Sequence, residues 1–161
     1  MGAEVERKFL LAERPDGLED HPAQRLEQGY LAIDPAGAEV RVRRKDDKTL
    51  MTVKSGLGLV RAEEEFAVEP ELFDRLWPLT GDRQVVKTRY LVPLGDGLTA
   101  EVDDYEGALA GLLTAEVEFP DEAAAHAFSA PEWMGEDVTG DKRYANQRLA
   151  TDGAPHSSAG S

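Results

Sequence analysis

The stretch that decides the fold is EVRVRRKDDKTLMTVKS, residues 39–55. Polar side chains recur at every second position in its first half, at Arg41 and Arg43, and in its second half, at Thr52 and Lys54. Residues two apart point to the same face of a β-strand. The acidic pair between the halves is typical of a turn. The stretch therefore predicts a β-hairpin with one charged face and one apolar face of Val and Met.

The same alternation recurs in segments 4–8, 61–65, 87–89, 101–103 and 116–118. One charged face is ordinary for a solvated sheet, but these faces carry both signs, with Arg and Lys on some strands and Glu on others. A sheet closed on itself would gather them into a shared interior. That interior would be a binding site rather than a core.

The predicted fold is mainly β, an eight-stranded antiparallel closed barrel (a tunnel) with a few short flanking helices. Strands follow strands with tight connections, as in antiparallel sheets, and about eight strands enclose room for one small ligand. Strands are predicted at 3–11, 24–33, 39–45, 49–55, from about 60, and at 85–94, 98–105 and 112–119; helices at 70–77, 122–128 and 141–149. We expect one domain over residues 1–149 and a disordered tail over 150–161, which is small and polar.

Composition narrows the classes of function. The net charge of −14 disfavours a nucleic-acid-binding surface, although a local basic channel would still attract a compact polyanion. The absence of cysteine excludes disulfides and thiolate chemistry, and three scattered histidines do not suit zinc. The N-terminus is charged rather than signal-like, and no apolar run approaches the ~20 residues of a membrane span. We expect a cytoplasmic protein without a membrane partner.

The acidic alternations predict carboxylates that share one cavity. Such groups repel each other unless a cation joins them, and hard oxygen ligands select Mg²⁺ or Mn²⁺. The alternative is that each pair only balances cations across strands. The candidates are Glu4, Glu6, Glu63, Glu65, Glu101, Asp103, Glu116 and Glu118.

The basic alternations predict a phosphate-binding wall. Arg forks bind phosphate oxygens in bidentate fashion, and Lys supplies point charges. The alternative for any one of them is a solvated strand face. The candidates are Lys8, Arg41, Arg43, Lys54, Arg61, Lys87 and Arg89. With the carboxylates, they describe a site for a phosphate chain bridged by a divalent metal.

The opening E4-V-E6-R-K8 resembles the E-x-E-x-K motif of the CYTH proteins, or triphosphate tunnel metalloenzymes. The resemblance continues in order through RVR, TVKS, RAEEE, KTRY, EVD, EVEF and DKRY, over residues 3 to 149. It is greatest to the short bacterial members that act on inorganic tripolyphosphate. It implies a tunnel in which Arg and Lys hold triphosphate and Glu holds metal.

Carried over residue by residue, the resemblance assigns roles to these side chains. Glu4, Glu6, Glu116 and Glu118 are similar to metal ligands, and Glu63, Glu65, Glu101 and Asp103 to the remaining acidic wall. The basic set corresponds to phosphate ligands. Lys142 and Arg143 lie where the family closes one tunnel end with a basic helix, or are solvated helix charges.

Tyr30 lies in QGYLAI, where the short bacterial members carry a similar tyrosine. A phenol has a pKa near 10, too high for a base at neutral pH. Beside Lys8 and a metal its pKa would fall, which would let it accept a proton from the attacking water. The alternative is a tyrosine packed at the tunnel rim.

The leading hypothesis is a metal-dependent hydrolase that cleaves a phosphoanhydride bond of a linear triphosphate, with tripolyphosphate giving pyrophosphate and phosphate. Alternatives within the family are a nucleoside or thiamine triphosphatase and an adenylate cyclase. A binding module without turnover and a structural barrel with internal ion pairs are the alternatives outside catalysis. The sequence does not decide between a monomer and a homodimer.

Overall fold

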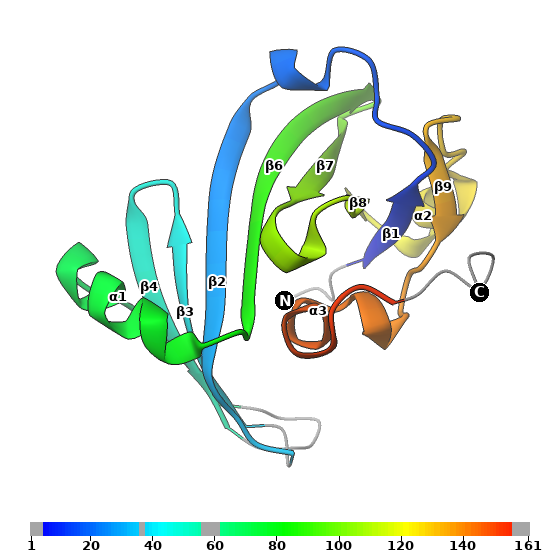
Figure 1. Ribbon diagram of the computed structural model, residues 1–161. Helices are drawn as coiled ribbons and strands as arrows, with labels where there is room; N and C mark the ends of the chain where they lie inside the picture. Colours follow the sequence, from blue (N-terminus) through cyan, green and yellow to red (C-terminus); the bar gives the residue numbers. More distant parts are fainter. Residues whose placement is uncertain (1–4, 36–37, 56–61, 156–161) are drawn as a thin grey trace.

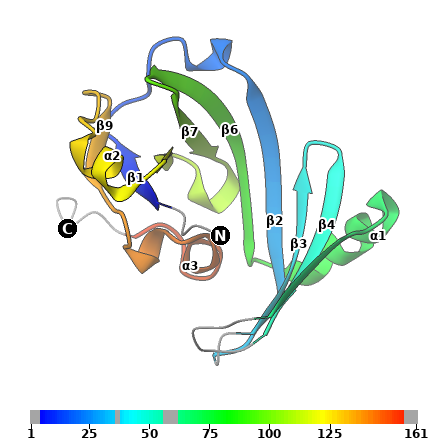
Figure 2. The ribbon, with the colours of Figure 1, turned by 180° about the vertical axis from the view of Figure 1, so that it is seen from behind.

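One antiparallel sheet organises the chain (Figure 1). The structure, a computed structural model, describes residues 5–35, 38–55 and 62–155. The strand order is β5-β4-β3-β2-β6-β7-β8-β1-β9. The bounds are β1 Val5–Leu11, β2 Ala23–Ile33, β3 Glu39–Lys45, β4 Lys48–Lys54, β5 Glu63–Ala67, β6 Gln84–Gly95, β7 Leu98–Tyr105, β8 Leu113–Phe119 and β9 Met134–Asp137. The sheet curves strongly, as Figure 2 shows from behind.

The predicted count of eight strands is wrong, because β9 adds a ninth. β9 has the sequence MGED, too short to display alternation, and it pairs with β1. The expected closed barrel is not observed either: within the described ranges β5 and β9 are edge strands that do not pair with each other. The antiparallel, mainly β architecture is confirmed.

Two predicted helices are found where expected. α1 spans Pro70–Leu76 and continues as a 3-10 turn over Trp77–Thr80. α2 spans Glu122–Ala127, and the Asp121 carboxylate accepts a hydrogen bond from the amide of Ala124, which stabilises the first turn. Further 3-10 turns lie at Leu18–Asp20 and Gly107–Leu109. No helix in the described ranges has the length and apolarity to cross a bilayer.

The predicted helix over 141–149 is divided into two pieces. A 3-10 turn spans Lys142–Tyr144, Ala145 is extended, and α3 begins at Asn146. α3 continues to Asp152, so the boundary expected at residue 149 falls inside this helix. The last residues of the expected tail, 156–161, lie outside the described residues.

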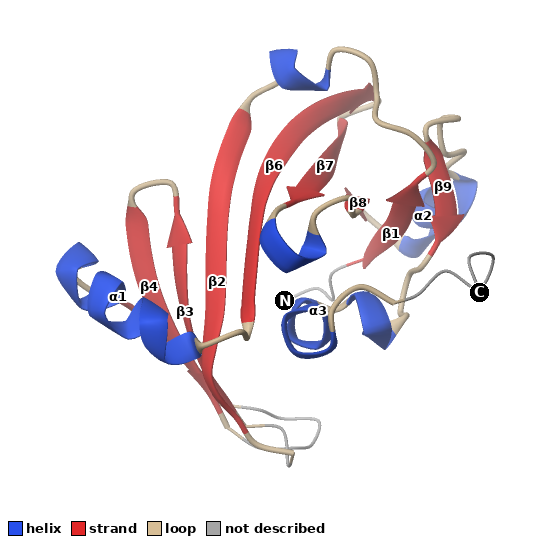
Figure 3. Ribbon diagram, in the orientation of Figure 1, coloured by secondary structure: helices blue, strands red, loops and turns tan. Residues whose placement is uncertain are grey.

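Helices cover both faces of the sheet, and Figure 3 shows α3 inside its curve. We call the face that bears Lys8, Arg41 and Lys87 the inner face, and the opposite face the outer face. On the outer face, Phe119 of β8 packs against Phe128 with ring centroids 5.2 Å apart. On the inner face, α3 packs against Tyr30, Val85 and Tyr105 through residues that include Leu149 and Ala150.

A close approach couples β2 to the turn after α1. A Cβ at Gly29 would lie 2.7 Å from the side chain of Thr80, closer than real contacts allow. Thr80 is buried and donates a hydrogen bond to the carbonyl of Trp77. Glycine is therefore required here to seat this turn against the strand that carries Tyr30.

Candidate functional site

The alternating charges of neighbouring strands meet on the inner face because the strands pair in register. Lys8 of β1 lies opposite Glu116 of β8, which in turn lies opposite Glu101 of β7. One step along the strands, Glu6 lies opposite Glu118. Directly opposed side chains in an antiparallel pair have Cβ atoms roughly 5 Å apart. The register of the sheet therefore places these carboxylates on the same face as Lys8.

Cations of the predicted phosphate wall occupy the same face. Arg41 and Arg43 lie on β3 and Lys54 on β4, while Lys87 and Arg89 lie on β6 beyond β2. The side chains of Arg41, Lys87 and Arg89 are at most 18% exposed. Cations held in such a low-exposure surface need carboxylates or a bound anion.

Lys87, Arg89 and Asp103 form a buried ion network. The Lys87 ammonium lies 2.9 Å from Asp103, and Arg89 holds both carboxylate oxygens, at 2.8 and 3.0 Å. Burial alone would raise the pKa of Asp103, but Lys87 and Arg89 outweigh it and hold that pKa below its usual value. Asp103 is thus engaged by two cations and fixes them.

Lys8 is held at the junction of the acidic and basic sets. Its ammonium lies 3.8 Å from Glu116 and donates a 2.7 Å hydrogen bond to the carbonyl of Tyr144. Burial lowers the pKa of Lys8, an effect that Glu116 partly offsets. A nearby polyanion would favour its charged form.

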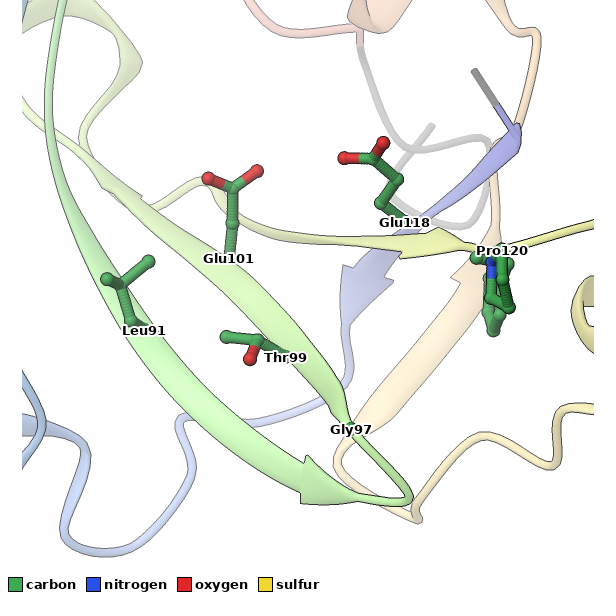
Figure 4. Close-up of a pocket in the computed structure, with 7 residues that line it drawn as sticks. Leu91, Gly97, Thr99, Glu101, Glu118 and Pro120 are labelled. Carbon is green, nitrogen blue, oxygen red and sulfur yellow. The ribbon is translucent and has the colours of Figure 1, made fainter. Parts of the chain in front are cut away.

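Two cavities open beside the carboxylates. One, of about 510 Å³, is lined by Glu101 and Glu118, whose carboxylates rise from the same side of β7 and β8 in Figure 4. The other, of about 290 Å³, is lined by Glu6, Lys8 and Glu116. These cavities together give a small charged ligand access to the acidic end of the inner face.

The donor chemistry of this end fits Mg²⁺ or Mn²⁺, because Glu6, Glu101, Glu116 and Glu118 offer carboxylate oxygens. Within residues 5–35, 38–55 and 62–155, no three such side chains converge closely enough to hold an ion by themselves. Glu4, the fourth predicted ligand of the first strand pair, lies outside the described residues, as does Arg61.

Glu63 and Glu65 lie on the edge strand β5, away from β7, β8 and β1 in the sheet order. Glu65 accepts a hydrogen bond from Thr52 and lies 3.8 Å from Arg43. Glu63 lies opposite Lys54. The structure therefore brings this predicted acidic pair to the cations of β3 and β4, not to Glu116.

The expected fall in the pKa of Tyr30 depends on a metal ion beside Lys8, and it stays a prediction. The side chain is 1% exposed, and burial raises the pKa of its phenol, with a further rise from Glu39. Its hydroxyl accepts a hydrogen bond from Gln28, and its electrostatic partners are Glu39 and Arg41. Packing by α3 is the physical cause.

The two predicted basic residues of the C-terminal segment lie in different surroundings. Lys142 lines the cavity beside Lys8. Arg143 is exposed and turns to Asp141, at 2.6 Å. Arg143 thus corresponds to a solvated helix charge.

Several inner-face residues were missed by sequence reasoning. Asn146 accepts a hydrogen bond from Lys87, and Gln147 donates one to Glu39, at 3.1 Å. Glu39 and Gln28 share the parity of Arg41 and Tyr30, which would have placed them on this face. The two α3 residues carry no such local signal.

Comparison with known proteins gives consistent results over most of the chain. The family model described as CYTH domain matches residues 2–151. The inorganic triphosphatase of Nitrosomonas europaea is 48% identical over 147 residues, 91% of this chain and 96% of that protein. The inorganic triphosphatase of Acetivibrio thermocellus is 37% identical over 152 residues, 92% and 94% of the two chains. A crystal structure of an inorganic triphosphatase, 43% identical, superposes with a TM-score of 0.84 and covers 96% of this chain and 99% of that one.

Proposed function

This chain belongs to the CYTH domain family, and we propose that it hydrolyses inorganic tripolyphosphate to pyrophosphate and phosphate with the help of a divalent metal ion. The relatives named inorganic triphosphatase support this activity, because they match nearly the whole chain at up to 48% identity. The single observation that carries the proposal is the arrangement of charges on the inner face. It sets a row of cations beside a group of carboxylates, as a metal-bridged phosphate chain requires.

The cations bind and orient the substrate. Arg41, Arg43, Lys87 and Arg89 hold phosphate oxygens and neutralise the charge that develops as the terminal P–O bond breaks. Asp103 keeps Lys87 and Arg89 in place through its ion pairs. Lys8 lies 3.8 Å from Glu116 and binds the phosphate nearest the carboxylates.

Glu6, Glu101, Glu116 and Glu118, with Glu4, would hold Mg²⁺ or Mn²⁺. The metal supplies neutralisation of phosphate oxygens and a water of lowered pKa. Water attacks the terminal phosphorus, the bridging oxygen leaves with pyrophosphate, and the proton of the water is lost to solvent or a neighbouring carboxylate. Because its pKa is raised, Tyr30 is proposed to act as a hydrogen-bond donor rather than as the base.

The aromatic residues of the inner face favour a purely inorganic substrate. Tyr30, Tyr105 and Tyr144 are all buried, and none presents an open ring on which a base or thiazole could stack. The large exposed apolar side chains of the described residues are Val53, Phe66 and Leu79, and by strand parity the first two lie on the outer face. This favours tripolyphosphate over nucleoside or thiamine triphosphates.

The closed tunnel is also a proposal. It is supported by the curvature of the sheet (Figure 1) and by the stretch 144–147, which contacts Lys8 of β1, Lys87 of β6 and Glu39 of β3. If substrate draws the halves together, the radius of gyration from small-angle scattering will fall when tripolyphosphate and Mg²⁺ are added.

The deciding experiment measures phosphate release from tripolyphosphate, ATP and thiamine triphosphate, each with Mg²⁺, with Mn²⁺ and with EDTA. We expect the highest kcat/KM on tripolyphosphate and no turnover with EDTA. Preferential turnover of ATP or thiamine triphosphate would replace the inorganic substrate. A raised melting temperature with tripolyphosphate but no turnover would identify a binding module.

A further inference from the structure

One residue of α3 borders two neighbouring cavities of the inner face. The larger, of about 290 Å³, has Lys8 and Glu116 in its wall. The smaller, of about 40 Å³, has Lys87 and Arg89 in its wall. Asn146 lines both of them. A phosphate chain whose oxygens reach the cations of both cavities therefore passes this side chain.

The backbone around Asn146 holds two lysines of the predicted phosphate wall. The Lys8 ammonium donates a 2.7 Å hydrogen bond to the carbonyl of Tyr144, and the Lys87 ammonium donates a 3.3 Å hydrogen bond to Oδ1 of Asn146. Tyr144 and Asn146 are two residues apart, so their Cα atoms are at most about 7 Å apart. The two lysines also interact electrostatically, because burial lowers the pKa of Lys8 and the charge of Lys87 lowers that pKa further. Both cations are therefore held by the same three-residue stretch.

Lys87 fixes the orientation of the Asn146 amide. An ammonium has three donors and no acceptor, so the oxygen of the amide faces it and the nitrogen cannot. Over the residues that the structure describes, Nδ2 of Asn146 donates a hydrogen bond to no protein group. The side chain is half-buried and lies among cations. An unused N–H donor is therefore presented at a surface that suits an anion.

We propose that Asn146 binds the substrate, donating from Nδ2 to a phosphate oxygen of the triphosphate while Oδ1 holds Lys87. The inference rests on the proposed function. A neutral amide suits this position because it is both a donor and an acceptor. A lysine in its place would bind phosphate but repel Lys87, whereas an aspartate would hold Lys87 but repel phosphate. Asparagine satisfies both neighbours.

The alternative is that Asn146 only positions Lys87. Asn146→Asp separates the two roles, because it keeps an oxygen for Lys87 and replaces the amide donor by a second acceptor. A carboxylate in the first turn of α3 also interacts favourably with the helix dipole. If Asn146 only positions Lys87, this variant keeps its activity. If Asn146 binds phosphate, the activity falls although the fold is as stable as before.

The first experiment measures the melting temperature and, at saturating Mg²⁺, kcat/KM for tripolyphosphate in wild type, Asn146→Asp, Asn146→Ala and Arg148→Gln. Arg148 is the matched control, because its side chain on α3 is 51% exposed and its replacement changes the net charge by the same amount as Asn146→Asp. We expect kcat/KM to fall about tenfold or more in Asn146→Asp, since a hydrogen bond to a charged group is lost and like charges meet. The fall should be smaller in Asn146→Ala and absent in Arg148→Gln. The melting temperature of Asn146→Asp should equal or exceed that of wild type.

A second experiment needs no variant. Asn146 is the only asparagine of the chain, so labelling with ¹⁵N-asparagine gives a single side-chain amide pair in the NMR spectrum. Tripolyphosphate is titrated with EDTA present, where we expect it to stay uncleaved. The side-chain amide pair should shift downfield as tripolyphosphate binds, and sulfate at the same ionic strength should not shift it.

Three results would overturn the inference: a kcat/KM in Asn146→Asp as high as in Asn146→Ala, an equal loss in Arg148→Gln, or a side-chain amide pair that saturating tripolyphosphate leaves unshifted. If Asn146→Asp loses its cooperative melting transition, the NMR titration decides. If wild type cleaves no triphosphate but the amide pair shifts, the proposed function fails and Asn146 is still a phosphate-binding residue.

Discussion

Replacing Asp103 by Asn should destabilise the protein more than any other single charge removal on the inner face. The side chains of Asp103 and Lys87 are 6% and 7% exposed, so the mutation leaves a buried ammonium without its carboxylate. Breaking one partner of such a pair costs about 3–5 kcal/mol. Domains typically have a free energy of unfolding of about 5–15 kcal/mol, so the variant should still fold over most of that range.

The assay is urea unfolding followed by circular dichroism, with the free energy of unfolding taken at a common slope for both proteins. Glu101→Gln is the matched comparison, because Glu101 also pairs with Arg89, at 3.3 Å, but is 41% exposed. Exposed pairs contribute about 0–1 kcal/mol. A loss below about 1 kcal/mol in Asp103→Asn, or an equal loss in the two variants, would refute the buried-network argument.

The remaining predictions concern pH, packing and turnover. Folding lowers the pKa of Asp103, so the stability that its carboxylate gives the protein is complete above the unfolded pKa of about 3.9 and is lost as pH falls through the folded pKa. The stability of wild type should therefore fall more steeply with acid than that of Asp103→Asn. Parallel curves of stability against pH would contradict this. Gly29→Ala should cost roughly 1–3 kcal/mol in urea unfolding through overpacking against Thr80, and an unchanged midpoint would rule out the contact. Lys8→Ala should lower kcat/KM for tripolyphosphate by about 10²-fold or more, with a much smaller change in melting temperature; full activity would remove Lys8 from the site. Tyr30→Phe should retain the pH profile of kcat but raise KM, since the phenol keeps its proton; a lost pH limb would restore it as the base.

The parity of charged residues could be predicted from sequence because the period of a strand is fixed at two. Once Arg41 and Arg43 share a face, pairing in register brings them beside the inner-face residues of β2 and β4. The helices predicted at 70–77 and 122–128 depend on equally local signals, because a proline begins α1 and the Asp121 side chain caps α2. These features depend on a few neighbouring residues, and they were confirmed.

The features that sequence could not supply depend on distant packing. The pKa of Tyr30 is set by burial under α3, more than a hundred residues later. Asp103 contacts two cations rather than a metal site because the pairing of β6 with β7 places the side chains of Lys87 and Arg89 beside it. β9 is a strand because β1 offers an edge for it, and its own four residues give no pattern.

The stretch from Tyr144 to Gln147 has a consequence for how the protein is made. Its carbonyl and side chains reach Lys8 of β1, Lys87 of β6 and Glu39 of β3. A chain leaves the ribosome with its N-terminus first, and a domain generally folds as one unit. The strands β1, β3 and β6 emerge before this stretch, so three of their inner-face side chains lack these partners until residues 144–147 have been translated. A nascent chain that stops before them would have its sheet but not a finished site.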